Sequence, residues 1–453
     1  MSKFDVVVLG GGPAGLNAGF SLVEAGKKVC IINDKKEKLG GVCLNAGCMP
    51  TKSFLKAAAA YRYAKKADVY GLSVSADAVD LSRVKESVDA GIAKLRMGIG
   101  MMSENSGAHL IFGQGEFQSA NEILVKKDDG TTEIVSGDKI IISTGSTSRE
   151  LPFAKFDGKV IMNSDMMLTN DKLPERLLVI GGGAIGCEFA TIYSTFGSKV
   201  KVVEALDQLI PNDDADAAAM LKERFEEQGI DVATGVMVES IEVTNHKACV
   251  KYKNINDIEE FDMVLISIGR KPNIESLNLD KAGVDVENGA VKVNEYLQTS
   301  NANIYAAGDL IGGYMFAHSA AYEGEVVATN INNDRSLALD ERAVPRVVFT
   351  NPEMASTGII KTSDSVKELY VPGLMKGRPI TDKVDVGLLK LFVDKTDNII
   401  VGGVIVGDSA TEIIHEIVMA VQNRLSILQL KETMHAHPTF AEPLPHLAMT
   451  GLI

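Results

Sequence analysis

The chain has 453 residues, of which 45% are hydrophobic and 23% charged, a composition typical of a globular protein with two to four domains. Its formal net charge of −14 argues against nucleic-acid and anionic-membrane partners, which bind basic surfaces. No apolar run is long enough to span a membrane, and MSKFDVVVLG does not resemble a signal peptide. We therefore expect a cytoplasmic protein, although an organellar enzyme without its transit peptide would look much the same.

A glycine-rich turn follows the first predicted strand. FDVVVLGGGPAG (Phe4 to Gly15) joins a β-branched run to the pattern G-x-G-x-x-G, a helical pattern comes next, and VCII at Val29 to Ile32 closes the unit. In a dinucleotide-binding fold such glycines let the backbone turn tightly and approach a pyrophosphate at a helix N-terminus. The context therefore predicts a dinucleotide site at Gly10, Gly12 and Gly15.

The residue that binds the ribose of this first dinucleotide can be placed at two positions. An acidic residue is expected about twenty positions after the fingerprint. Counting forward from Gly26 points to Asn33, and counting back from Gly40 points to Asp34. Of the two we favour Asp34.

Two cysteines follow in the stretch GGVCLNAGCMPTKS (Gly40 to Ser53). In a regular α-helix, residues five positions apart point in different directions, and their Cα atoms lie too far apart for a disulfide. Cys43 and Cys48 can therefore bridge only across an irregular turn, which Gly47 permits. Pro50 suits the first turn of the helix that follows. Cys48 then lies just ahead of a helix N-terminus, whose dipole stabilises a thiolate.

Local sequence leaves three interpretations of this cysteine pair open: a redox-active disulfide, a metal clip or two unpaired core thiols. A metal site needs four ligands, and neither a second cysteine pair nor a histidine lies nearby, so we expect no metal. A disulfide in a reducing compartment is more often catalytic than structural. The other three cysteines, Cys30, Cys187 and Cys249, we interpret as small core residues.

The stretch LLVIGGGAIG (Leu177 to Gly186) repeats the first fingerprint, and KVVE at Lys201 to Glu204 closes its unit. A carboxylate at Glu204 accepts from a ribose 2′-hydroxyl and repels a 2′-phosphate, which favours NAD over NADP. The predicted NAD-binding residues of this repeat are Gly181, Gly183, Ile185, Gly186 and Glu204.

The segment GGVCLNAGCMPTK resembles the active-site segment of the FAD-dependent pyridine nucleotide-disulfide oxidoreductases, and the likeness covers essentially the whole chain. Matching segments follow in the family's order: ISTGS (Ile142 to Ser146), GCE (Gly186 to Glu188), IGRKPN (Ile268 to Asn273), TSNANIYAAGDL (Thr299 to Leu310), MFAHSAAYEG (Met315 to Gly324), VVFTNPEMASTG (Val347 to Gly358) and HAHPTFAE (His435 to Glu442). Within the family, the likeness is strongest to the members that oxidise dihydrolipoyl groups.

The resemblance implies that FAD and NAD are the cofactors and that Cys43 and Cys48 form a redox-active disulfide. Asp309 would bind the ribityl chain of the flavin, and Gly269 would join the NAD site. The FAD residues implied beyond the first fingerprint are Asp34, Gly41, Lys52, Gly115, Thr144, Gly145, Asp309 and Ala317.

Thiol-disulfide exchange needs a base, and an imidazole has a pKa near the working pH. A C-terminal histidine alone is more often structural, but the resemblance selects His437 as the base, oriented by Glu442, and leaves His435 as a structural neighbour. It also matches Lys52 and Glu188 to the family's ion pair beside the flavin.

The resemblance further implies an electron path and a shared active site. A dihydrolipoyl group on a protein of a 2-oxo acid dehydrogenase or glycine cleavage complex attacks Cys43, and Cys48 passes the electron pair to FAD and on to NAD⁺. In a homodimer, His437 of one subunit serves Cys43 of the other.

We therefore expect an α/β fold with two Rossmann-like domains and a C-terminal α+β dimerisation domain. The predicted boundaries are 1–146 and 269–338 for the FAD-binding domain, 147–268 for the NAD-binding domain and 339–453 for the dimerisation domain. Two alternatives stay open. An NADPH-dependent reductase of the glutathione reductase type would carry Arg in place of Glu204. A non-enzymatic flavoprotein would lack a cysteine or the base, and this chain has Cys43, Cys48 and His437.

Overall fold

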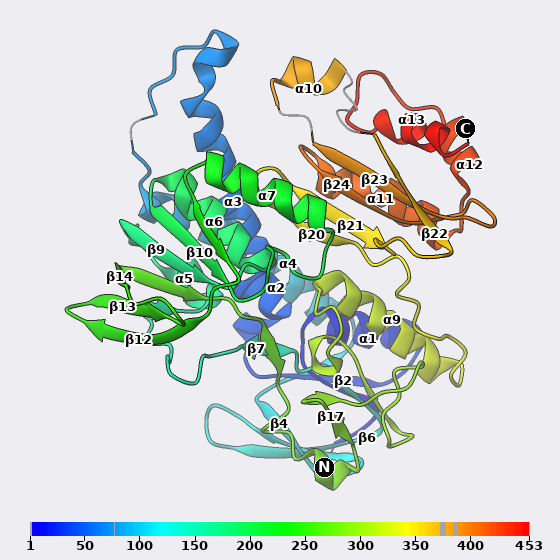
Figure 1. Cartoon of the computed structure of the whole chain (residues 1–453). Coiled ribbons are helices and arrows are strands. Elements are labelled where there is room, and N and C mark those ends of the chain that lie inside the picture. The colour runs from blue at the N-terminus through cyan, green and yellow to red at the C-terminus, as the bar shows by residue number, and fades with distance from the viewer. Residues whose placement is uncertain (1, 77, 372–376, 385–386, 453) are drawn as a thin grey trace. The chain divides into compact units, whose positions relative to one another are not determined.

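The computed structural model describes residues 2–76, 78–371, 377–384 and 387–452 (Figure 1). They form two compact units. The first comprises Met1–Ser53, Ser82–Arg149 and Gly269–Leu339, and the second comprises Phe54–Leu81, Glu150–Ile268 and Asp340–Ile453.

The first unit is built on one large sheet with the strand order β3-β2-β1-β6-β5-β4, in which β19 also pairs with β6. The strands are β1 (Ser2–Leu9), β2 (Val29–Asn33), β3 (His109–Phe112), β4 (Gln114–Ser119), β5 (Glu122–Lys126), β6 (Thr132–Ile142) and β19 (Ile304–Ala306). Parallel pairing joins β3, β2, β1, β6 and β19. Antiparallel pairing joins β4 to β5 and β5 to β6.

Both faces of this sheet are covered, which explains why β1 and β2 read as continuous apolar runs rather than alternating ones. Helices α1 (Pro13–Glu24) and α9 (Ala317–Asn332) contribute to the core on one face (Figure 1). The β4-β5 hairpin and the short helix α8 (Leu279–Ala282) contribute to the core on the other face.

The second unit contains a parallel sheet with the order β11-β10-β9-β15-β8. Its strands are β8 (Ile161–Met162), β9 (Arg176–Ile180), β10 (Lys199–Glu204), β11 (Asp231–Thr234) and β15 (Met263–Ile266), and its main helices are α6 (Ala184–Phe196) and α7 (Ala215–Glu227). An antiparallel three-stranded sheet of β12 (Val238–Thr244), β13 (Lys247–Tyr252) and β14 (Ile258–Phe261) belongs to the same unit.

A third sheet in the second unit is antiparallel, with the order β20-β21-β24-β23-β22. The strands are β20 (Arg346–Val348), β21 (Met354–Gly358), β22 (Val366–Tyr370), β23 (Leu388–Asp394) and β24 (Ile400–Val406). Helices α11 (Ala410–Gln422), α12 (Ile427–Glu432) and α13 (Pro443–Thr450) share its apolar core.

Two parallel Rossmann-like sheets and a C-terminal antiparallel sheet confirm the predicted fold class. The chain passes between the units after Ser53, Leu81, Arg149, Ile268 and Leu339. The last three points lie close to predicted boundaries, whereas residues 54–81, which we predicted in the FAD-binding domain, belong to the second unit. Because residues 150–268 and 340–453 belong to one compact unit, the division into three domains stays a prediction.

Gly324 allows α9 to approach α1. A Cβ atom added at this position would overlap the backbone carbonyl oxygen of Ala14. We predict that Gly324→Ala lowers the free energy of unfolding by about 1–3 kcal/mol, because the two helices must separate. Thermal unfolding of the FAD-bound protein measures this change. Gly91→Ala is the matched control, since Gly91 lies in open space within α4 (Leu81–Asn105); equal loss in both variants would contradict the prediction.

Candidate active site

Close backbone contacts leave room only for glycine at the first and third positions of each fingerprint. Gly10 and Gly181 have φ angles of +110° and +105°, and a Cβ atom at Gly10 would overlap the carbonyl oxygen of Ser143. A Cβ atom at Gly15 would overlap the Gly10 carbonyl oxygen, and one at Gly186 would overlap that of Gly181. Each turn therefore has the strand-to-helix geometry of a dinucleotide site.

The second glycine of each fingerprint has no such overlap, and a Cβ atom at Gly12 would lie 3.8 Å from the Gly41 Cα. Gly12 and Gly183 are the N-cap residues of α1 and α6, and neither provides a side-chain cap. A Cβ atom at Gly183 would meet no atom of the described residues within 4 Å. The first backbone N–H groups of each helix are thus available to a phosphate, so the residues present fit two dinucleotides.

Two serines that the sequence analysis missed complete these turns. The Ser143 hydroxyl donates to the carbonyl oxygens of Leu9 and Gly10, and the Ser267 hydroxyl donates to those of Ile180 and Gly181, all at 3.0–3.1 Å. A second sequence repeat, I-S-x-G at 142–145 and 266–269, could have indicated these two serines.

The ends of β2 and β10 hold equivalent residues. Glu204 ends β10, and its two carboxylate oxygens accept from the N–H groups of Gly182 (2.7 Å) and Leu206 (2.8 Å). Asn33 ends β2, and its Oδ1 accepts from Gly11 N at 2.9 Å.

Asn33 therefore occupies the position in the first unit that Glu204 occupies in the second. Asp34 lies one residue beyond β2, and its carboxylate pairs with Lys38 Nζ at 2.6 Å on the surface. This equivalence favours Asn33 over Asp34, the residue that we predicted, as the ribose contact. The ribose contact itself stays a prediction.

Several predicted FAD residues lie together in the first unit. The Asp309 carboxylate accepts a short hydrogen bond from the Ser146 hydroxyl and lies 3.9 Å from Arg270 Nε. Burial raises the pKa of Asp309 above its ordinary value, against that hydrogen bond. The Thr144 hydroxyl donates to Asn273 O at 2.9 Å, and Gly145 has a φ of +71°. These contacts hold residues 144–146 beside 270–273 and 309.

Three other predicted cofactor residues are placed differently. Ala317 is the first residue of α9, at a helix N-terminus. Gly115 lies in β4, where a Cβ atom would lie 2.7 Å from the Leu9 side chain, so packing alone accounts for that glycine. Gly269 has a φ of +106° and begins the last segment of the first unit, so its contact with NAD stays a prediction.

Glu323 was quoted in a motif without a role, and the structure supplies one. It is buried in α9, and its Oε2 accepts from the Gly308 N–H at 2.5 Å. The residue therefore fixes the backbone immediately before Asp309. Only the fold could reveal this bond, because it joins a helix to a separate turn.

The cysteine segment forms two short helical stretches joined at Gly47. α2 (Gly41–Ala46) carries Cys43, and α3 (Cys48–Lys65) begins at Cys48. Gly47 has φ −145° and ψ −116°, and a Cβ atom there would lie 2.9 Å from the Val42 carbonyl oxygen. The predicted irregular turn is confirmed, with Cys48 as the first helical residue rather than the one before it.

Neighbouring side chains fix this turn. Thr51 binds the Gly47 carbonyl oxygen through both its N–H (3.1 Å) and its hydroxyl (2.7 Å). Asn45 Nδ2 donates to the carbonyl oxygens of Leu39 and Gly41, and Arg96 Nε donates to Asn45 Oδ1 at 2.6 Å. The Thr51 bonds therefore fix the turn from within, and Arg96 on α4 ties α2 to another helix.

The two thiols are chemically unequal. A hydrogen bond from Cys43 to Cys48, together with burial, raises the pKa of Cys43 above the ordinary cysteine value. The positive charge of Lys52 acts in the opposite direction. Cys48, at the N-terminus of α3 and one turn before Lys52, is therefore the better site for a thiolate.

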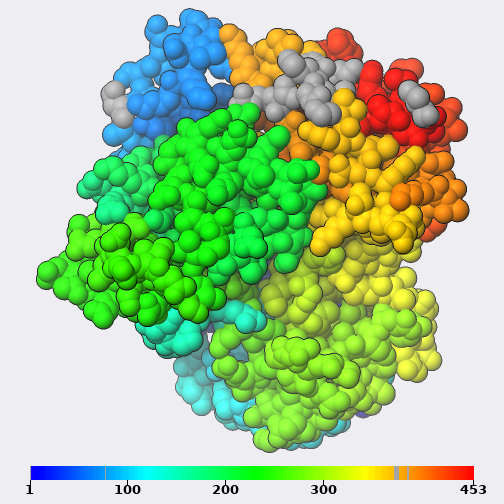
Figure 2. Space-filling model, in the orientation of Figure 1, coloured from blue at the N-terminus to red at the C-terminus, as the bar shows by residue number. Residues whose placement is uncertain are grey.

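His437 and Glu442 form a pair near the C-terminus, in a segment that lies at the surface (Figure 2, red). His437 Nδ1 lies 2.8 Å from Glu442 Oε1, while Glu442 Oε2 accepts from Thr439 N at 2.9 Å. The His437 side chain is 76% exposed and that of Glu442 13%. No described residue bonds His437 Nε2, so the ring is oriented by the carboxylate and its other nitrogen can take a proton.

His435 contacts α11 instead. Its ring is buried, with Nε2 2.8 Å from Glu416 Oε2 on α11 and Nδ1 3.0 Å from Thr433 O. This arrangement supports its interpretation as a structural neighbour of His437.

Glu188 is buried in α6, and its Oε1 accepts from the Phe349 N–H at 3.1 Å. Lys52 belongs to the first unit and Glu188 to the second, so their ion pair stays a prediction.

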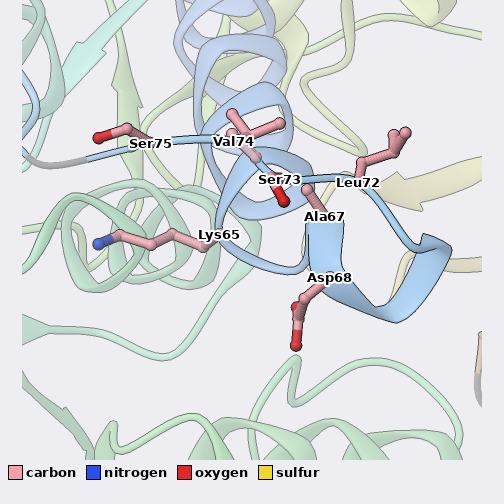
Figure 3. A pocket seen from close by; sticks show the side chains of 8 residues that line it. Lys65, Ala67, Asp68, Leu72, Ser73, Val74 and Ser75 are labelled. Carbon is pink, nitrogen blue, oxygen red and sulfur yellow. The ribbon is translucent and has the colours of Figure 1, made fainter.

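A hollow of about 450 Å³ lies outside all of these groups (Figure 3). The end of α3, the 3-10 helix η2 (Ala67–Tyr70) and the loop after it line this hollow. Its polar side chains are those of Lys65, Asp68, Ser73 and Ser75. None of the predicted site residues is among them.

Comparison with known families agrees with this geometry. A family model described as pyridine nucleotide-disulphide oxidoreductase matches residues 4–324, and the dimerisation domain of the same family matches residues 344–448. The chain belongs to the pyridine nucleotide-disulphide oxidoreductase family. It is a flavoprotein disulfide oxidoreductase of the glutathione reductase/LpdA class.

Individual members of the pyridine nucleotide-disulphide oxidoreductase family match almost end to end. A dihydrolipoyl dehydrogenase of Bacillus subtilis is 34% identical over 99% of this chain and 98% of its own. A dihydrolipoyl dehydrogenase of Chlamydia muridarum is 34% identical over 97% of this chain and 95% of its own. The crystal structure of LpdA from Mycobacterium tuberculosis has a TM-score of 0.92 at 27% identity, covering 99% of both chains. The Cu(II) complex of the HOCl-induced flavoprotein disulfide reductase RclA from Escherichia coli has a TM-score of 0.88 at 27% identity, covering 99% and 100%.

Pyridine nucleotide-disulphide oxidoreductases bind FAD and a pyridine nucleotide, and the dimerisation domain supports a homodimer. Among the helices within the described ranges, none combines the length and apolarity required to cross a membrane.

The unequal thiols lead to a prediction about alkylation of reduced protein. Cys48→Ala removes the hydrogen-bonded partner that raises the pKa of Cys43, so Cys43 should react with iodoacetamide at lower pH than in wild type. Lys52→Met removes a positive charge that lowers the pKa of Cys43, so alkylation of Cys43 should move to higher pH in this variant. Peptide mass spectrometry across a pH series measures both shifts. Lys56→Met, further along α3, is the control, and shifts in the same direction for both test variants would refute the assignment.

Proposed function

We propose that the protein oxidises dihydrolipoyl groups carried by partner proteins of a 2-oxo acid dehydrogenase or glycine cleavage complex in the cytoplasm. Electrons pass through Cys43 and Cys48 to FAD and then to NAD⁺. The observation that carries this proposal is the inequality of the two thiols, because it separates a substrate-facing sulfur from a thiolate that donates electrons. The near full-length likeness to dihydrolipoyl dehydrogenases supports the choice of substrate.

Cys43, Cys48 and His437 together accept the electron pair and the protons of the dithiol. In the oxidised protein Cys43 and Cys48 share a disulfide. His437 Nε2, on the other subunit of the homodimer, takes the proton of one substrate thiol, and the thiolate attacks Cys43 while Cys48 leaves as a thiolate. The second substrate thiol then attacks the substrate sulfur of the mixed disulfide, and Cys43 leaves and takes the proton of the imidazolium. The imidazole takes the proton of that second thiol, and lipoyl leaves oxidised, so the step ends with a Cys43 thiol, a Cys48 thiolate and an imidazolium.

The surroundings suit each role. The raised pKa of Cys43 keeps it protonated after release, and the α3 dipole and Lys52 stabilise the thiolate at Cys48. FAD, when bound, accepts the electron pair from that thiolate and supplies a hydride to the nicotinamide. Asn33, Asp309 and the first fingerprint would hold FAD, and Glu204 and the second fingerprint would hold the coenzyme.

The choice of NAD over NADP rests on the Glu204 carboxylate. It is buried, and both oxygens are fixed by backbone N–H groups, so it cannot turn away from a ligand at the end of β10. A 2′-phosphate at this position would meet an anion, whereas a ribose hydroxyl would meet an acceptor.

A paired assay tests the proposal. We expect purified FAD-bound protein to reduce NAD⁺ with dihydrolipoamide and to turn over glutathione disulfide with NADPH far more slowly. Preference for the second pair would indicate a reductase of the glutathione reductase type instead. His437→Gln should lower kcat/KM for dihydrolipoamide by about 10²–10⁴-fold, since it removes a general base. His415→Gln, at an exposed histidine on α11, should leave the rate unchanged.

The order of the sulfurs has its own spectroscopic test. A thiolate beside the flavin gives a long-wavelength absorption band after two-electron reduction, and we expect Cys48→Ser to abolish it. Cys43→Ser, the matched variant, should retain a band because Cys48 is still present. A band that survives in Cys48→Ser would show that the two roles are reversed.

A further inference from the structure

The stretch from Glu204 to Asp214, which we name the coenzyme loop, joins the end of β10 to the start of α7. Its first half is attached to the second fingerprint: Glu204 accepts from Gly182 N, and Ile210 N donates to Gly182 O at 2.8 Å. Leu209 is fully buried and lies against the same glycine, where a Cβ atom would meet its Cδ2 at 2.6 Å. Any movement of this loop therefore changes the surface offered to the coenzyme.

The other end of the coenzyme loop carries two buried carboxylates. Asp214 caps α7 through Oδ1, which accepts from the N–H groups of Asp216 (3.1 Å) and Ala217 (3.0 Å), while its Oδ2 accepts from Lys390 Nζ at 3.0 Å. Asp213 Oδ2 accepts from the Ser356 hydroxyl at 2.7 Å.

Arg346 adds a second cation to the same end of the loop. Its Nε lies 3.7 Å from Asp213 Oδ2 and 2.9 Å from the Ser356 hydroxyl. Arg346, Ser356 and Lys390 lie on β20, β21 and β23, so all three cationic or donating groups come from the antiparallel C-terminal sheet.

Lys390 is the central member of this cluster. Only 2% of its side chain is exposed, and its Nζ also lies 2.5 Å from Asp216 Oδ2 and 3.3 Å from Glu368 Oε2. Burial by itself would lower the pKa of Lys390, but its hydrogen bonds with Asp216 and Asp214 raise it above the ordinary value. A buried ammonium group without these partners would be strongly unfavourable, so the contact with the loop is costly to break.

We infer that Lys390, Ser356 and Arg346 are positioning residues for the coenzyme site, through which the C-terminal sheet holds the loop that carries Glu204. This inference rests on the proposed function only in taking Glu204 as the coenzyme contact. The sheet thus does more than present an interface: it sets the affinity for the nucleotide.

The position of the cluster predicts which step of the reaction a change at Lys390 affects. Cys43 and Cys48 belong to the first unit, whereas the coenzyme loop and its cluster belong to the second. A change at Lys390 should therefore weaken NAD⁺ binding while reduction of the flavin by dihydrolipoamide continues at its normal rate. A merely structural lysine would, when replaced, reduce flavin content and both steps together.

The test measures the two steps separately on the FAD-bound dimer. Calorimetric titration with NAD⁺ and with NADPH gives the nucleotide affinity without any dithiol, and rapid mixing with dihydrolipoamide gives the rate of flavin reduction. We expect Lys390→Met to raise the Kd for NAD⁺ about tenfold or more. Ser356→Ala, which removes one hydrogen bond to Asp213 and is the milder change, should raise it about threefold.

Lys367→Met is the matched control, because Lys367 lies on β22 of the same sheet and donates to Gly451 O rather than to the loop. Unchanged NAD⁺ affinity in both Lys390→Met and Ser356→Ala, or an equal loss in Lys367→Met, would overturn the inference. If the wild type binds only NADPH, the proposed function fails. Weaker NADPH binding in Lys390→Met and Ser356→Ala would then still uphold the positioning role.

Discussion

The carbonyl oxygen of Val42 leaves no room for a side chain at position 47, and the chain passes from α2 to α3 at this glycine. Because of this turn, Cys43 and Cys48 form a hydrogen-bonded pair, which residues five apart on a regular helix could not do. Cys48 also becomes the first residue of α3. The different environments of the two sulfurs follow from that single backbone constraint.

The same kind of constraint shapes both nucleotide sites. Gly10 and Gly15, like Gly181 and Gly186, place one backbone against another so closely that no Cβ atom fits. Each crossing leaves a helix N-terminus open toward the end of a parallel sheet, where a dinucleotide pyrophosphate can bind. One fold unit used twice therefore fits the two dinucleotides that the family binds, FAD and a pyridine nucleotide, and the cysteine pair follows directly after the first unit.

Sequence reasoning predicted the features that depend on local backbone geometry. The fingerprint glycines, the turn at Gly47 and the two parallel sheets each leave a pattern within a few residues. It left undecided the features that depend on strand ends or on distant partners. Asn33 could not be placed from spacing, because only the end of β2 shows that it is equivalent to Glu204.

Buried polar groups were the hardest to predict. Glu323 binds the backbone of a separate turn, and Lys390 meets carboxylates from α7 more than 170 positions away in the chain. Within GLLKLFV the lysine interrupts an otherwise apolar strand. Its burial is visible only once the C-terminal sheet is seen against the coenzyme loop, because nothing in the local pattern encodes the partner.

Peptide mapping by mass spectrometry, without prior reduction, tests the central claim most directly. The account predicts a Cys43–Cys48 disulfide in the oxidised FAD-bound protein, its loss on addition of dihydrolipoamide, and its return when NAD⁺ is added in excess. Alkylation of both thiols before any reductant is added, or a disulfide that persists in the presence of dihydrolipoamide, would contradict the account.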